Sequence, residues 1–180
     1  MTKTLIRYCC ITALMGLTGI VLAVSPSEKQ QLDNFKVSTL KGLRKVAVKV
    51  VIVRDDASML PFLKEQALQG EVELALQNAD IEITRPASEV GIYIVLVKIT
   101  AASNDNLNIA MHVQSSLLQI VSLSRDTTIK TETMTWPSFG KSGFGVASVA
   151  IAKSTIEKIV KEQARDFTND WRAANPKRQP

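Results

Sequence analysis

The chain has 180 residues, of which 46% are hydrophobic, 22% are charged and only 5% are aromatic, and its formal net charge is +5. This length suits one ordinary domain, and this composition excludes a disordered or fibrous protein. Acidic and basic residues are interspersed and form no block of like charge, so the sequence gives no indication of nucleic-acid binding.

Residues 1–23 have the pattern of a signal peptide. Lys3 and Arg7 precede an uncharged, largely apolar run that continues to Val24, with a small residue at Ala23 suited to cleavage. Cleavage would lower the formal charge from +5 to +3, because the segment carries these two cations and no acid. The alternative is an uncleaved anchor, although the run is short for a bilayer span, which takes about 20 residues. We predict an exported, periplasmic or extracytoplasmic protein, and we expect any transient membrane contact to involve residues 1–23.

Both cysteines of the chain, Cys9 and Cys10, lie inside this segment. A bacterial lipoprotein carries its cysteine at the cleavage point, and neither cysteine is placed there. We therefore predict that the protein is not a lipoprotein. A mature chain that starts near Val24 contains no cysteine, so it has no disulfide, no thiol nucleophile and no thiolate metal site.

The first predicted elements of the mature chain are a lead-in segment, a strand and a helix. Residues 24–44 carry scattered apolar side chains that either form a short helix or pack loosely. Residues 45–53 are almost uncharged and rich in β-branched residues, which is typical of a central strand with both faces covered. Residues 60–79 repeat apolar side chains at spacings of three and four, and Pro61 suits a first turn, which predicts an amphipathic helix.

The rest of the domain is predicted to consist of strands followed by one long helix. Residues 107–123 alternate apolar and polar side chains, with a bulge or bend near Ser115 and Ser116. Phe167 and Trp171 share the apolar stripe of the last helix and are predicted to be core. The expected strands are residues 81–84, 91–99, 107–123 and 127–136, and the last helix covers residues 145–174.

These elements follow one another in the order β-α-β-β-β-β-α. We predict an α+β fold with a single domain, residues 45–174, in which two amphipathic helices pack on one face of a mixed, mostly antiparallel sheet. Residues 175–180 form a short basic tail.

The segment from Trp136 to Gly145 contains Gly-Lys-Ser after a predicted strand, as a phosphate-binding loop does. The position that this motif reserves for its first glycine is occupied by Thr135, and Pro137 has no N–H to donate to a phosphate. We therefore predict no nucleotide site and no cofactor. The segment is interpreted as a loop between the last strand and the last helix, with Phe139 and Phe144 packed against the core. The alternative is a loop that contacts a partner.

The residues with the most catalytic potential are two aspartates and the single histidine. Asp55 and Asp56 follow the first strand, at the edge where open α/β sheets often hold catalytic or metal-binding carboxylates. Capping of the next helix by Asp56 or Ser58 explains them more simply. His112 lies on the polar side of its strand, and neither a zinc ligand set nor a Gly-x-Ser-x-Gly motif accompanies it. We predict no metal site and no enzymatic activity.

Two alternatives to a non-enzymatic protein stay open. One is an exported hydrolase that uses Asp55 or Asp56 with His112, which requires these side chains to meet around a pocket. The other is a carrier of a small apolar ligand, which requires a cavity between the sheet and the helices.

The Thr-rich strand of residues 127–136 has the features of an edge strand. It has few large apolar residues and is followed by Pro137, and the unpaired backbone groups of an edge can recruit a partner. The loop that follows carries aromatic and basic side chains beside this edge. We predict that a contact surface for an envelope protein is formed jointly by Trp136, Phe139, Lys141 and Phe144.

Residues 46–52, a helix, and then residues 76–83 form a pattern that resembles the amino-terminal α/β module of the periplasmic protein TolB. It is also similar to the related domains of curli-secretion and penicillin-binding-protein activator lipoproteins. The likeness covers roughly residues 45–100, but the family would have glycine where this chain has Asp80, and the lipid-anchoring cysteine is missing. The resemblance implies a non-catalytic envelope module that docks onto other proteins, and it transfers no functional residue. The resulting prediction is an exported, non-enzymatic binding or assembly module of a bacterial cell envelope.

Overall fold

The computed structural model describes residues 26–54, 60–84, 93–103, 108–137 and 143–176. The chain divides into two packing units, residues 1–33 and residues 34–180. Helix α2, Pro26–Ser38, contains the boundary between them. The sheet and the other helices all belong to the second unit, and the description below concerns that unit alone.

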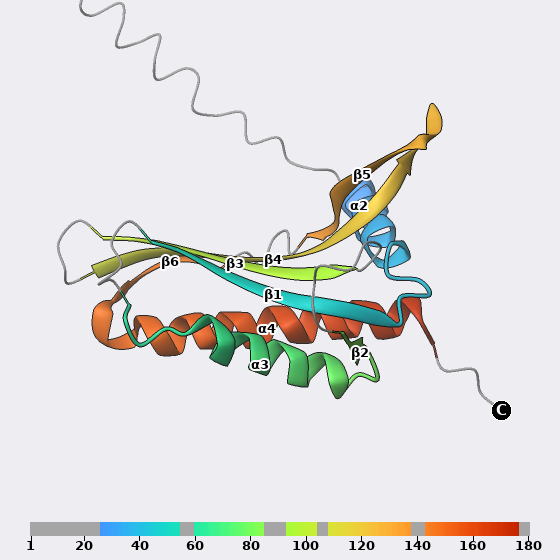
Figure 1. Ribbon diagram of the computed structural model, residues 1–180. Helices are drawn as coiled ribbons and strands as arrows, with labels where there is room; N and C mark the ends of the chain where they lie inside the picture. The colour runs from blue at the N-terminus through green and yellow to red at the C-terminus, as the bar shows by residue number, and fades with distance from the viewer. Residues whose placement is uncertain (1–25, 55–59, 85–92, 104–107, 138–142, 177–180) are drawn as a thin grey trace, which may run out of the picture. The chain divides into compact units, whose positions relative to one another are not determined.

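A six-stranded mixed sheet is the centre of this unit (Figure 1). Five strands follow the order β2-β1-β3-β4-β5, and β6 pairs with β4 off this path. β1 is parallel to β2 and β3, whereas β4 is antiparallel to β3, β5 and β6, so the prediction of a mixed, mostly antiparallel sheet is confirmed. The strands are β1, Lys45–Arg54; β2, Glu82–Ile83; β3, Ile94–Ala102; β4, Asn108–Leu123; β5, Asp126–Pro137; and β6, Gly143–Ser148.

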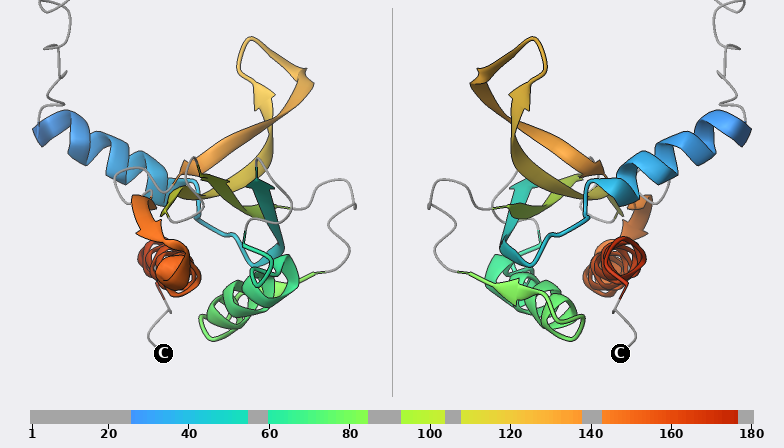
Figure 2. Two further views of the ribbon diagram at one scale, coloured as in Figure 1. Left: turned by 90° about the vertical axis from the view of Figure 1, so that its left-hand side faces the viewer. Right: turned by 90° about the vertical axis from the view of Figure 1, so that its right-hand side faces the viewer.

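Two helices, α3 (Glu65–Gln77) and α4 (Val149–Ala174), cover one face of this sheet (Figure 2). The predicted packing of amphipathic helices on one face is confirmed. The core lies in this interface, where alternate residues of the strands meet the apolar stripes of the helices. Its members include Val46, Val48 and Val50 of β1, Val95, Val97 and Ile99 of β3, Val72 and Leu76 of α3, and Ile156, Val160 and Phe167 of α4. In the described part of the chain, no helix combines the length and the apolar character that a membrane span needs.

The prediction that both faces of β1 are covered is wrong. The sequence favoured a strand with both faces covered, yet Lys49 is exposed between buried Val48 and Val50. Strand side chains alternate between the two faces, so one side of β1 meets α3 and α4, whereas the other side is exposed at Lys49 and Val53 and buried at Ala47. The same alternation holds in β3, where Lys98 is exposed between buried Val97 and Ile99.

Element boundaries differ from the predicted ones at three places. α3 begins at Glu65 rather than near residue 60, because Leu60 has a φ of 56°, which is incompatible with a right-handed helix. Asp56 and Ser58, its predicted caps, lie outside the described residues, and the N-cap of α3 is Lys64. β3 ends at Ala102 rather than at residue 99. The irregularity predicted near Ser115 and Ser116 is confirmed as a register shift between Leu117 and Leu118 in the pairing of β4 with β5.

The third difference is β6, which replaces the predicted start of the last helix. Residues 143–148 pair with residues 113–108 of β4 in antiparallel register. The backbone groups of β4 in this stretch offer partners that a helix would leave unused. The helix therefore starts only at Val149, after Ser148 in extended conformation.

The absence of a side chain at Gly143 lets β6 approach α4 closely. We expect a substitution that adds a methyl group there to destabilise the fold. A Cβ atom added at Gly143 would lie 2.5 Å from Cγ2 and 2.6 Å from Cδ1 of Ile159. We expect Gly143→Ala to lower the free energy of unfolding by about 1–3 kcal/mol through overpacking. Gly145→Ala is the matched control, because its added Cβ would meet nothing within 4 Å.

Urea denaturation followed by circular dichroism measures both variants. The control should be neutral or more stable by about 0.4–1 kcal/mol, since alanine restricts the unfolded chain. Equal effects of the two substitutions would show that the contact with Ile159 does not limit the distance between β6 and α4.

Candidate partner-binding surface

The structure separates the residues that were predicted to form one contact surface. Trp136 is completely buried, whereas Phe144 is 77% exposed. In the register of β4, Trp136 lies opposite Leu117 and Phe144 lies opposite His112, which places the two aromatic side chains on opposite faces of the sheet. Trp136 is therefore removed from the predicted surface. Phe139 and Lys141 lie outside the described residues.

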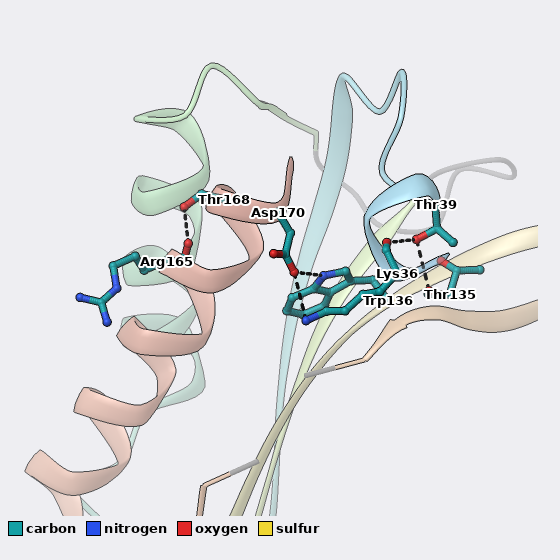
Figure 3. A network of polar contacts seen from close by, with 7 residues as sticks. All are labelled: Lys36, Thr39, Thr135, Trp136, Arg165, Thr168 and Asp170. Atoms are coloured by element: carbon teal, nitrogen blue, oxygen red, sulfur yellow. Dashed lines mark hydrogen bonds and ion pairs between the residues drawn. The ribbon is translucent and has the colours of Figure 1, made fainter. Parts of the chain in front are cut away.

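Trp136 is instead the centre of a polar and aromatic cluster formed by β5, α4 and Lys36, which lies in the part of α2 that belongs to the second unit (Figure 3). Its Nε1 donates a hydrogen bond of 2.9 Å to Oδ2 of Asp170, and Nζ of Lys36 lies 3.0 Å from the same oxygen. The lysine also sits 4.4 Å from the centroid of the indole, and Phe167 packs edge-on at 4.9 Å. Every part of the tryptophan thus has a partner in the fold, which gives it a structural role.

The segment that follows α2 is fastened to the end of α4. Nε1 of Trp171 donates to the carbonyl of Leu43 at 2.6 Å. Nδ2 of Asn175 donates to the carbonyl of Leu40 at 2.9 Å, and Oδ1 of the same side chain accepts from the N–H of Gly42 at 2.7 Å. Phe167 is buried and Trp171 packs against the core, so the prediction that both belong to the core is confirmed.

β5 is the last strand in the order of the sheet, as its composition predicted. Part of its outer edge is already in use, because Oγ1 of Thr39 donates to the carbonyl of Thr135 at 3.2 Å. At its start, the hydroxyl and the backbone N–H of Thr128 donate to the carboxylate of Asp126 at 2.6 and 3.0 Å. These bonds hold the pKa of Asp126 below its usual value and fix the turn of the hairpin.

The described residues provide no further evidence for the two alternative functions, a hydrolase and a carrier of a small apolar ligand. Asp55 and Asp56 lie outside the described residues, and the His112 ring lies 6.3 Å from that of Phe144 at 51°. The described residues contain no group of three or more metal-binding side chains. A depression of about 160 Å³ lies between α3 and α4, not between sheet and helices, and its lining includes Leu74 and Val160. The hydrolase and the ligand carrier stay predictions.

The sheet face opposite α3 and α4, which we call the open face, carries the most exposed apolar side chains. At one end, Phe144 is 77% and Val146 is 69% exposed. The strand registers place Phe144 in one row across the sheet with His112, Thr100 and Val53, and Val53 is 41% exposed. This end of the open face is thus an apolar patch carried by β6 and β1, with a histidine between them.

The middle of the open face is basic. Lys98 lies opposite Val51 of β1 and Gln114 of β4, and Lys49 lies two residues before Val51 on the same face. Both lysines are exposed. Among the described residues, neither lysine forms an ion pair.

The other end of the open face is the base of a projecting hairpin. β3 begins at Ile94, opposite Leu118, so the rest of β4 pairs only with β5, and this hairpin rises on the side of the sheet away from α3 and α4 (Figures 1 and 2). Met134, opposite Leu118, is 42% exposed, and Ile120, opposite Glu132, is 41% exposed. In the sequence, the open face is indicated only by Lys49 and Lys98, each of which interrupts an otherwise apolar strand.

Comparison with solved structures gives distant likenesses alone. No protein-family model matches the chain, and no curated protein matches it. One solved structure that it resembles is a minor lipoprotein from Acinetobacter baumannii, which is 11% identical with a TM-score of 0.39. The alignment covers 78% of this chain and 99% of that one. Such a likeness says nothing of what this chain binds.

No family model supports the specific resemblance to TolB and the activator lipoproteins. Asp80, where that family would have glycine, has a φ of 65°. It therefore takes the left-handed conformation that glycine adopts most readily, at the turn that follows α3. The prediction that the chain carries no lipid anchor concerns residues 1–23, which lie outside the described residues.

Proposed function

We propose that this protein is an exported, non-enzymatic binding or assembly module of a bacterial cell envelope, and that it contacts a protein partner through the open face. The signal-peptide pattern of residues 1–23 supports export. The observation that carries the proposal is the apolar patch at Phe144 and Val146, which are 77% and 69% exposed. Neighbouring large apolar side chains that stay in water are typical of interaction sites.

The energetics favour burial of this patch by a partner. Complete burial of a phenylalanine or valine side chain is worth about 1.5–3 kcal/mol. Phe144 and Val146 are two residues apart on β6, so a single partner surface can cover both. Aromatic side chains at the centre of an interface often contribute a large share of the binding energy.

A photo-crosslinking amino acid at position 144 tests the proposal in intact cells of the organism that exports the protein. We expect position 144 to capture a specific envelope protein. Leu74 is the matched control, because it is 56% exposed on α3, in the layer away from the open face. Equal capture from position 74, or exported protein that captures no partner from position 144, would contradict the proposal.

The variant Phe144→Ser should weaken capture from a neighbouring crosslinker position, such as Val146, by about tenfold, the equivalent of about 1.4 kcal/mol. The free energy of unfolding should change by no more than ~0.5 kcal/mol, because the side chain is exposed. Leu74→Ser should leave capture unchanged. A Phe144→Ser variant that unfolds would instead assign the ring to the core.

A further inference from the structure

The distribution of charge on the open face indicates what kind of segment fits it. The exposed lysines, Lys49 and Lys98, lie on neighbouring strands between two apolar regions. One region is the patch of Phe144 and Val146, and the other is the base of the hairpin with Met134. A partner that covers both apolar regions must also cover the lysines. Carboxylates at that point would compensate the cost of removing the ammonium groups from water.

The dimensions of the face suit a helix. On β4, Ala110 lies opposite Val146, and Ile120 lies ten residues further along at the hairpin. At ~3.4 Å per residue this stretch of β4 is about 34 Å long, which corresponds to about 23 residues of α-helix. A helix is about 10 Å wide, or roughly two spacings between strands. Among the described residues of the second unit, α3 and α4 lie on the opposite face, so a partner helix here would add a second helical layer.

Two other occupants fit less well. A flat anionic bilayer would meet the projecting β4–β5 hairpin before it reached the middle of β1 and β3 (Figure 1), and on this face the hairpin carries Glu132 beside Lys130, which gives it no net positive charge there. A second copy packed open face to open face would bring Lys49 and Lys98 towards the same residues of the other copy. Like charges at an interface are unfavourable.

Resting on the proposed function, we propose that the partner presents an acidic amphipathic helix, which lies along β3 and β4 and places its carboxylates on Lys49 and Lys98. Its apolar residues cover Phe144 and Val146 at one end and Met134 and Ile120 at the other. The apolar contacts supply most of the affinity. The lysines select an acidic segment and set its position along the strands.

A crosslinker at Gln114, beside Lys98 on the open face, tests this in the full chain in exporting cells. We expect it to capture the same protein as position 144. Sequencing of the crosslinked peptide should show an amphipathic helical pattern with acidic residues. A neutral or basic segment, a lipid adduct or a second copy of this chain would overturn the inference. Capture at position 144 alone would overturn it too but leave the proposed function intact, and capture at neither position overturns both.

Charge reversal gives the second measurement. The pair Lys49→Glu and Lys98→Glu should reduce capture at position 144 by about tenfold. Its control is Lys64→Glu with Lys158→Glu, which changes the net charge equally but lies in the helix layer. Should the reversal impair folding, Lys49→Gln with Lys98→Gln takes its place, with a reduction of about threefold. Unchanged capture in the lysine variants would overturn the inference.

Salt dependence separates charge from apolar contact for the captured partner once it is purified. Raising the ionic strength from ~0.15 M to ~1 M shortens the Debye length from about 8 to about 3 Å. The affinity of the wild-type protein should fall over this range, whereas that of the Lys49→Gln, Lys98→Gln variant should change much less. Equal salt dependence of the two proteins would show that these lysines do not contact the partner.

Discussion

Replacing Trp136 by alanine should lower the free energy of unfolding by about 3–5 kcal/mol. The side chain is completely buried, and its ring packs edge-on against Phe167 at 4.9 Å. Its loss leaves a cavity between β5 and α4, and it removes the indole donor from Asp170 and the aromatic face from Lys36. The free energy of unfolding of an ordinary domain is about 5–15 kcal/mol, so the variant should be close to unfolding.

Trp136→Phe separates packing from hydrogen bonding in this cluster. The variant keeps an aromatic ring but loses the 2.9 Å bond to Asp170, whose carboxylate retains Lys36 at 3.0 Å. We expect a smaller loss, of about 1–2 kcal/mol. Urea denaturation gives both values, and a constant slope of the transition shows that only stability has changed. A loss below ~1 kcal/mol for Trp136→Ala would contradict the structural role assigned to this residue.

Replacing Gln163 by alanine should be the second most damaging change, with a loss of about 2–4 kcal/mol. The side chain is 1% exposed in the middle of α4, where a glutamine is unusual. Its Oε1 accepts from the hydroxyl of Ser115 at 2.7 Å, and its Nε2 donates to the carbonyl of Val113 at 2.9 Å. Alanine removes both bonds inside the core and leaves a cavity.

A double-mutant cycle identifies the hydrogen-bonded pair as the cause. Gln163→Leu keeps most of the volume, but it deprives the buried hydroxyl of Ser115 of this acceptor, at a cost of about 1–3 kcal/mol. Adding Ser115→Ala should recover part of the loss, because two apolar groups then face each other. Strictly additive effects in urea denaturation would show that the two side chains do not interact.

Much of the fold could be predicted because short-range periodicity controls it. The β-branched run of β1 and the apolar stripe of α4 each identify their element, and the Thr-rich composition of β5 identifies its edge position. β6 could not be predicted, because its six residues include Gly143 and Gly145 and show no long alternation. Its strand conformation depends on pairing with β4 and on the space that Gly143 leaves for Ile159.

The candidate site was only partly predictable for a similar reason. Phe144 is exposed, which contradicts the core interpretation of its loop and is compatible with the predicted contact surface. Trp136 was placed beside it because the two are close in sequence, yet it is completely buried. Strand alternation and the irregularity at Leu117 decide which face Trp136 occupies. Lys49 and Lys98 give a signal that could have been used, since a charge within an apolar strand indicates that one face is uncovered.

The bonds that join Trp171 and Asn175 to the segment before β1 bear on how the chain is made and on the export proposed for it. They connect residues that are 128, 133 and 135 positions apart. A ribosome releases the segment around Leu40 long before it releases these partners, so the native body cannot close during synthesis. Contacts of such separation also slow folding after release. A chain that stays open until its last helix is complete would suit the proposed export, because a translocation pore passes an unfolded chain.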